Sequence, residues 1–292
     1  MKKIELLRKL NIFMIFLIIL GIIVSISSFV LMVVSIIHYN YSGYLLLIAL
    51  ITLLLTLGVY FCTKKHKTTI INTILDNYMN DSSMSIKQED ITKSISYDVL
   101  RQIELDPING FGSSYSRSCI QDFVLTGKYE DINFVQNELQ VSTTEEKIYI
   151  LLDFETTVTK KIFDGIITEF DVDVIDYPIL IKTKKLKRMK NLPIIAENLN
   201  DEINDKFIIS YDYHSKKDIS LNSRAITRLN YLYEKNDGFF IFFYKNKVYY
   251  GQNKTKSFKI KMFKKITEDE LRQMASNYKK NLKEFIDILN TN

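Results

Sequence analysis

Residues 12–37 read IFMIFLIILGIIVSISSFVLMVVSII, a run of 26 residues without a single charged side chain. A second run, YLLLIALITLLLTLGVYFC over residues 44–62, is 19 residues long and equally uncharged. A bilayer core of about 30 Å needs roughly 20 apolar residues in a helix that rises about 1.5 Å per residue. Both runs therefore predict membrane-spanning helices, and the short connection His38–Gly43 predicts that they form a hairpin.

Basic residues gather at the outer ends of this hairpin and are missing from its connecting loop. Spans carry Lys and Arg on the cytoplasmic side because anionic headgroups and the membrane potential hold these charges there. The flanking cations are Lys2, Lys3, Arg8, Lys9, Lys64, Lys65 and Lys67. We expect a multi-pass protein of the cell membrane with both termini in the cytoplasm. A cleaved signal peptide is the alternative, but its apolar core is only about 7–15 residues long.

The polar residues within the spans are small, and none of them is ionisable. Ser25 and Thr52 are typical of hydroxyls that bond a neighbouring helix, and Gly21 and Gly58 favour close helix approach. A transporter or channel places ionisable groups inside the membrane, so the spans indicate an anchor. Cys62 at the end of the second span is either an acylation site or simply a small apolar residue.

The net charge of +5 belongs to the hairpin. Residues 1–67 carry seven basic residues and one acidic residue, whereas the remainder carries 32 basic and 33 acidic residues. A nearly neutral remainder removes the electrostatic support for nucleic-acid binding. Two distant cysteines, Cys62 and Cys119, form no disulfide framework or zinc motif, which fits a reducing compartment.

After the spans, the period of the sequence changes from helical to alternating. Residues 68–80 continue the second helix, and Ser96 is in position to cap a short helix. Helices are also expected over 223–233 and from Thr267, where Thr267 and Glu270 form a capping box. The alternation predicts strands at 122–129, 132–140, 147–156, 166–174, 179–182, 206–213, 238–245, 248–251 and 257–263.

This series predicts the α+β class, with a mostly antiparallel sheet after the transmembrane hairpin and a helix at the C-terminus. A partly closed barrel capped by the last helix is also compatible with it. We expect three parts: the hairpin over 1–67, a helical connector over 68–110 and a soluble α+β domain over 111–292.

Several short stretches support a resemblance through their order along the chain. They are Gly112–Tyr115, Gly127–Phe134, Asn137–Leu139, Ile162–Ile167, Phe207–Ser210 and Phe239–Tyr249. In this order the chain resembles a family of bacterial membrane proteins with an N-terminal two-helix hairpin and a cytoplasmic α+β domain of unknown function. The resemblance implies a bacterial membrane location, and it implies no activity, cofactor or catalytic residue.

Two basic runs are the candidate binding sites. Clustered cations beside a membrane can hold anionic headgroups, although Lys also commonly guards a solvated strand edge. The first run, which we predict to bind headgroups, is Lys182, Lys184, Lys185, Lys187, Arg188 and Lys190. The second run is Lys254, Lys256, Lys259, Lys261, Lys264 and Lys265.

Catalytic and metal motifs are weak in this sequence. Asp171 and Asp173 point the same way on an expected strand and, with Asp176, form a candidate cation site, but such a pattern also describes the wet face of a strand. His214 has no second His or Cys close in sequence, so it indicates a surface turn. We therefore expect no resident metal or cofactor.

The sequence favours a membrane-tethered binding module without enzymatic activity. Its predicted partners are the membrane, anionic lipid headgroups or an unidentified protein, and nucleic acid is not among them. The rival hypotheses are an enzyme with a dispersed site around Asp171 and Asp173, and a structural subunit of a larger membrane complex.

Overall fold

The computed structural model describes residues 2–37, 43–108, 115–149, 154–171, 178–196, 201–212, 223–255 and 267–289. The chain divides into two compact units. The hairpin unit comprises Met1–Met79 with Ile260–Asn277, and the sheet unit comprises Asn80–Lys259 with Tyr278–Asn292.

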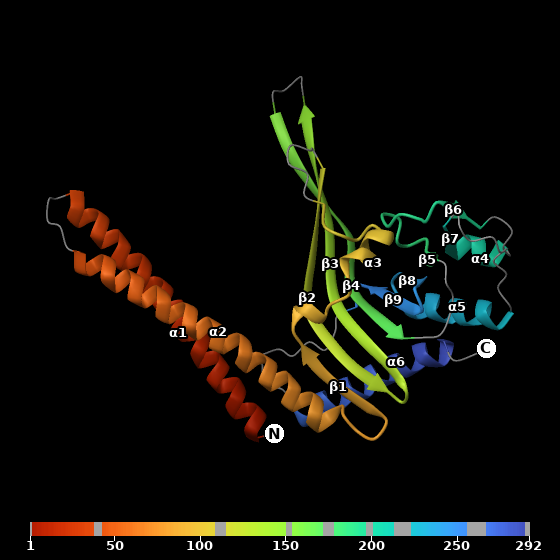
Figure 1. Ribbon diagram of the computed structural model, residues 1–292, viewed down its shortest axis with the longest axis horizontal. Coiled ribbons are helices and arrows are strands. Elements are labelled where there is room, and N and C mark those ends of the chain that lie inside the picture. The colour runs from red at the N-terminus through yellow and green to blue at the C-terminus, as the bar shows by residue number, and fades with distance from the viewer. Residues whose placement is uncertain are drawn as a thin grey trace. The chain divides into compact units, whose positions relative to one another are not determined.

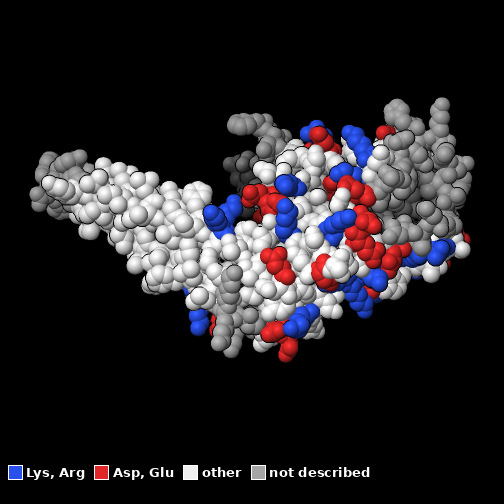
Figure 2. All heavy atoms as spheres, turned by 60° about the horizontal axis from the view of Figure 1, so that its bottom comes forward, with Lys and Arg blue, Asp and Glu red and all other residues white. Residues whose placement is uncertain are grey.

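The hairpin unit contains two long helices, α1 (Lys2–Ile37) and α2 (Gly43–Tyr78), that lie side by side (Figure 1). Both are long and apolar enough to cross a membrane, so the two expected helices are confirmed. In Figure 2 this pair is white over most of its length, because charged residues are confined to one end. The helix expected at 68–80 is also found, since α2 continues unbroken to Tyr78.

Small and hydroxyl side chains form the contact between α1 and α2. The Ser25 and Thr52 hydroxyl oxygens are 2.8 Å apart, and a Cβ atom on Gly21 would collide with the hydroxyl of Thr56. The large apolar side chains of both helices point outward instead. A Cβ atom on Gly58 would meet no described residue within 4 Å, so its expected role in close helix approach is wrong.

The sheet unit is built on nine antiparallel strands in the order β1-β2-β3-β4-β9-β8-β5-β7-β6. The sheet is open, with β1 and β6 at its edges, so the barrel alternative is wrong and the α+β prediction is confirmed. The strands are β1 Met84–Glu89, β2 Tyr115–Tyr129, β3 Ile132–Tyr149, β4 Phe154–Asp171, β5 Ile179–Thr183, β6 Ile194–Ile195, β7 Phe207–Tyr211, β8 Phe239–Tyr244 and β9 Lys247–Asn253.

Short helices and turns connect these strands, and a long helix ends the chain. As predicted, the Ser96 hydroxyl caps a short helix by accepting from the Asp98 amide. The Thr267 capping box is confirmed too: the Glu270 amide donates to Thr267 Oγ1 at 3.2 Å, and the Thr267 amide donates to Glu270 Oε2 at 2.8 Å. The helices are η1 Ile91–Lys93, α3 Tyr97–Gln102, α4 Asp201–Lys206, α5 Ser223–Lys235 and α6 Glu268–Leu289.

Several details of the expected strands are wrong. β1 and β6 were not expected, β2 begins at Tyr115 and not at residue 122, and the single strand predicted over 147–156 is instead the ends of two paired strands, β3 and β4. The turn between β8 and β9 is Lys245–Asn246, one residue earlier than expected. Both turn residues have positive φ, which the right-handed twist of a two-residue hairpin requires and Asn accepts readily. The strand expected at 257–263 lies outside the described residues.

Aromatic and aliphatic side chains pack the two faces of the sheet. On one face the second half of α6 lies against β4 and β9, where the Phe285 ring stacks on Tyr250 with centroids 3.9 Å apart. Another cluster joins α3 and the loop after β5 to β3, β4, β8 and β9. Leu186, Met189 and Leu192 of that loop are buried in this cluster, so the loop is fixed to the core.

Candidate functional site

The first basic run folds as two consecutive tight turns at the end of β5. The Leu186 amide donates to Thr183 O at 3.0 Å, and the Met189 amide donates to Leu186 O at 3.2 Å. Leu186 and Met189 point into the core, whereas the basic residues between and beside them are exposed. The spacing of three between buried residues therefore presents the cations Lys184, Lys185, Lys187, Arg188 and Lys190 to solvent.

These turns border an open hollow of about 710 Å³ on the sheet unit, which we call the basic hollow. It contains five of the six residues predicted to bind headgroups, and none of its described lining residues is acidic. Its lining consists of Lys182, Lys184, Lys187, Arg188, Met189, Lys190, Asn191, Leu192, Pro193, Ile195 and Ile208.

Two cations of the run are held by partners within the protein. Lys190 Nζ donates to Glu104 Oε1 at 2.8 Å. Lys185, which does not line the hollow, donates to Asn236 O at 3.3 Å and sits 4.3 Å from the centroid of the Tyr233 ring. Both side chains therefore have defined positions, and the Lys190 charge is already balanced.

The other cations lack a carboxylate partner among the residues that the structure describes. Arg188 Nη1 donates to Lys161 O at 2.8 Å, and Lys182 Nζ donates to Met189 O. Lys184 and Lys187 are exposed, and neither forms an ion pair with a described residue. The basic hollow thus concentrates positive charge that the described part of the protein leaves unbalanced.

Lys182 differs from its neighbours because it lies beneath the surface. It belongs to β5, and only 3% of the residue is exposed. Removal from water disfavours an ammonium group, and this burial lowers the pKa of Lys182 from 10.5 to about 8. The sequence predicted a surface cation here, whereas the structure places a buried one at the floor of the hollow.

Glu104 links Lys190 of the basic turns to Arg117 of β2. Besides Lys190, it accepts from Arg117 Nη2 at 3.2 Å, while Arg117 Nη1 donates to Asp106 at 3.3 Å. Glu104 follows the end of α3 with φ of 51°, a conformation normally filled by Gly at this position. Sequence reasoning missed Glu104 and Arg117, because Glu104 contacts Arg117 of β2 and Lys190 of the basic turns, which are 13 and 86 positions away.

The candidate metal residues are only partly described. Asp171 is at the end of β4, and Lys247 Nζ is 3.4 Å from its carboxylate and also contacts Glu169. An ammonium group therefore already occupies the space between these two acids. Asp173 and Asp176 lie outside the described residues. Within the described ranges, no group of three or more His, Cys, Asp or Glu side chains is arranged to hold a metal ion.

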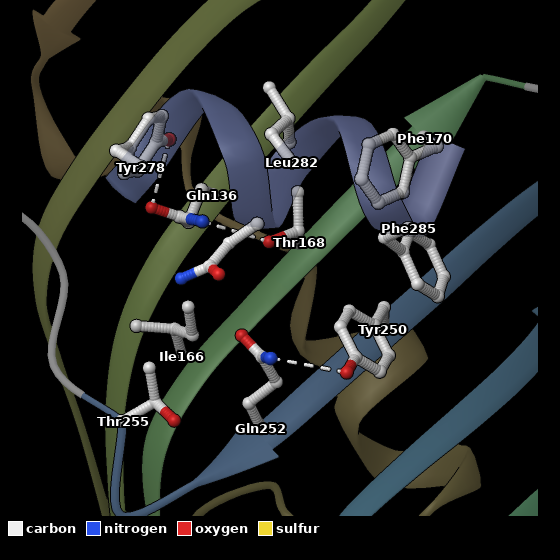
Figure 3. Close-up of a pocket in the computed structure, with 11 residues that line it drawn as sticks. Gln136, Ile166, Thr168, Phe170, Tyr250, Gln252, Thr255, Tyr278, Leu282 and Phe285 are labelled. Atoms are coloured by element: carbon white, nitrogen blue, oxygen red, sulfur yellow. Dashed lines mark hydrogen bonds between the residues drawn. The ribbon is translucent and has the colours of Figure 1, made fainter. Parts of the chain in front are cut away.

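A second concavity lies under α6, and we call it the helix cavity (Figure 3). Its volume is about 60 Å³, enough for a few water molecules. Tyr278 donates to Gln136 at 3.1 Å, Gln136 donates to Thr168 at 3.0 Å, and Gln252 donates to the Tyr250 hydroxyl at 3.1 Å. These five polar side chains thus bond one another, as in a packed interior.

Among the residues that the structure describes, the remaining candidates add no second site. Burial and the nearby Asp106 raise the pKa of Cys119 to about 11, so this residue remains a weakly nucleophilic thiol. Cys62 is exposed on α2. In the second basic run, Lys254 pairs with Asp237, and the other five lysines lie outside the described residues, as does His214.

Comparison with protein-family models, with curated proteins and with solved structures finds no match to this chain.

Proposed function

We propose that this chain is a membrane-anchored module whose sheet unit binds anionic lipid headgroups through the basic hollow. The observation that carries this proposal is the set of four cations, Lys182, Lys184, Lys187 and Arg188, that border one hollow without a described carboxylate partner. Buried or clustered charge without a partner costs free energy, so its presence suggests an anion supplied from outside.

The two apolar helices supply the reason to choose a lipid. A chain with two candidate spans keeps its sheet unit close to headgroups at all times. Because the helices would tether the sheet unit to the membrane, they would raise the effective concentration of headgroups around it. Even weak headgroup binding would then be populated. Each Lys or Arg near an anionic surface contributes about 1 kcal/mol to the free energy of binding, so several such residues together can hold the sheet unit to headgroups.

The proposal includes a topology in which both helices span the membrane and both termini are cytoplasmic. It is motivated by the basic residues at both outer ends of the hairpin. In a chain whose Cys62 and Cys119 are replaced by Ser, a Ser42→Cys change should react with an impermeant thiol reagent on intact cells. An Asn292→Cys change should react only after lysis, and the reverse pattern would refute the topology.

Headgroup binding can be tested on the full chain in nanodiscs of defined composition. Lysine acetylation read by mass spectrometry should be about fivefold slower at Lys184 and Lys187 in discs with phosphatidylglycerol than in neutral phosphatidylcholine discs. Lys128, an exposed residue on β2, serves as the internal reference. Equal labelling in both discs would refute headgroup binding and return attention to a protein partner.

A matched pair of variants separates this hollow from general surface charge. Lys184→Glu with Arg188→Glu should abolish the protection of Lys187 in anionic discs. Lys280→Glu with Lys283→Glu changes the net charge equally on the exposed side of α6 and should leave that protection intact. Equal loss in both double variants would mean that only net charge matters.

A further inference from the structure

The basic hollow has an apolar wall as well as cations. Pro193 and Ile195 are exposed there, with 49% of Ile195 accessible, and Ile208 of β7 contributes beside them. β6, which carries Ile195, is held at the edge of the sheet by two residue pairs with β7. A free inorganic anion would gain nothing from such a wall, whereas the glycerol and upper chains of a lipid would cover apolar surface there.

The number of unbalanced charges argues for a particular kind of headgroup. Arg188 uses Nη1 to bond Lys161 O, which leaves other guanidinium donors for a phosphate. Lys184 and Lys187 flank it on the same two turns, and neither has a described acidic partner. A phosphodiester headgroup with one negative charge leaves most of this positive charge unbalanced.

Lys182, at the floor of the hollow, also favours a headgroup with several acceptor oxygens. Lys182 Nζ has a single described acceptor, Met189 O, although an ammonium group carries three donors. Only 3% of the residue is exposed, but it lines the hollow, so an anion there can supply a further acceptor. A phosphate monoester has three terminal oxygens, one more than a phosphodiester, so it has acceptors for the floor and for the rim at once.

We infer that the basic hollow prefers a lipid whose terminal phosphate is a monoester or diphosphate over lipids with a phosphodiester headgroup. In this arrangement Arg188, Lys184 and Lys187 bind the phosphate from the rim, and Lys182 binds it from below. Pro193 and Ile195 contact the glycerol and the first carbons of the chains. This inference rests on the proposed headgroup binding and specifies its ligand.

The test uses the full chain in phosphatidylcholine nanodiscs that contain phosphatidic acid, diacylglycerol pyrophosphate or phosphatidylglycerol. Each lipid is titrated over the same range of surface charge. The readout is again the acetylation rate of Lys184 and Lys187 relative to Lys128. Half-maximal protection should need about tenfold less surface charge with either terminal-phosphate lipid than with phosphatidylglycerol. One additional charge-assisted hydrogen bond gives an effect of about this size.

The outcomes separate this inference from the proposed function. Equal protection by all three lipids at matched charge would refute the terminal-phosphate preference and leave headgroup binding intact. Protection by none of them would refute both. Equal protection by inorganic phosphate or pyrophosphate added to neutral discs would overturn the lipid assignment and identify a soluble phosphate ligand.

Two variants test the assigned contacts. Arg188→Lys keeps the charge and loses the planar fork of donors, so the tenfold preference should fall while protection by phosphatidylglycerol persists. Lys182→Met keeps the apolar stem at the floor and should reduce the preference in the same way. Retention of the full preference in both variants would refute the contacts. Lys280→Met, on the exposed side of α6, is the control.

Discussion

The helix cavity and the basic hollow lie on the same sheet unit and treat polar groups in opposite ways. In the helix cavity, Tyr278, Gln136 and Thr168 are joined by a chain of two hydrogen bonds (Figure 3). In the basic hollow, Lys184 and Lys187 have no described carboxylate partner. The comparison teaches that one concavity is part of the packing, while the other is lined by cations without a described carboxylate partner.

The largest effect should follow from removing an aromatic ring beside the helix cavity. Phe285 is 2% exposed and its ring contacts Tyr250 and Phe170, with centroids 3.9 and 5.0 Å apart. Phe285→Ala should lower the free energy of unfolding by about 3–5 kcal/mol, because a large buried side chain is lost and a cavity remains. Chemical denaturation measures the change. A loss below about 1 kcal/mol would mean that α6 is not packed on the sheet as described.

The next effect concerns pH and the floor of the basic hollow. The pKa of Lys182 is lowered by burial, so the unfolded chain binds more protons between about pH 8 and pH 10.5. The free-energy penalty for burying the ammonium group is fully present below about pH 8 and disappears as the pH rises toward about 10.5. Lys182→Met should therefore stabilise the protein most near neutral pH, and its advantage should shrink by about 2 kcal/mol by pH 10.

Melting curves of the wild type and Lys182→Met over this pH range measure the trend. Lys280→Met is the control, because it makes the same substitution at an exposed lysine of α6. An advantage of Lys182→Met that grows with pH would contradict the buried, partly destabilised ammonium.

A smaller effect is expected from the hydrogen-bond chain in the helix cavity. Tyr278→Phe removes the donor to Gln136 Oε1 without removing the ring. The loss should be about 1 kcal/mol, because a water molecule in the adjacent cavity can replace the hydroxyl as donor. Thermal unfolding measures it. A loss as large as that of Phe285→Ala would show that no water compensates.

The smallest effect should come from the rim of the basic hollow. Lys187→Glu changes an exposed side chain without a described ion pair, so the free energy of unfolding should change by no more than about 0.5 kcal/mol. The same substitution should weaken headgroup protection of Lys184. Strong destabilisation with unchanged protection would reverse the roles that the comparison assigns to the two concavities.

The elements predicted best are those whose signal is local in sequence. Uncharged runs predicted α1 and α2, and Thr267 with Glu270 predicted the start of α6, because spans and caps depend on adjacent residues. The strand predicted over 147–156 is wrong because an apolar run carries no mark of where a chain reverses. β1 was missed because its alternation covers only the six residues Met84–Glu89.

The placement of the first basic run was predicted in part for a similar reason. Five basic residues of the first run are exposed on two turns, as their density suggested. The burial of Lys182 could not be predicted, since its place on β5 among fully buried residues depends on neighbouring strands. The Glu104–Lys190 pair joins residues 86 positions apart and has no local signal.

The contact between α1 and α2 has a consequence for how this sequence can change over evolutionary time. Many Leu, Ile, Val and Phe side chains on the outward faces are exposed, so they can exchange for one another readily. Gly21, Ser25, Thr52 and Thr56 meet across a spacing that larger side chains would disrupt. Relatives of this protein should therefore differ most at the outward-facing apolar positions of the two helices and least at these four small residues.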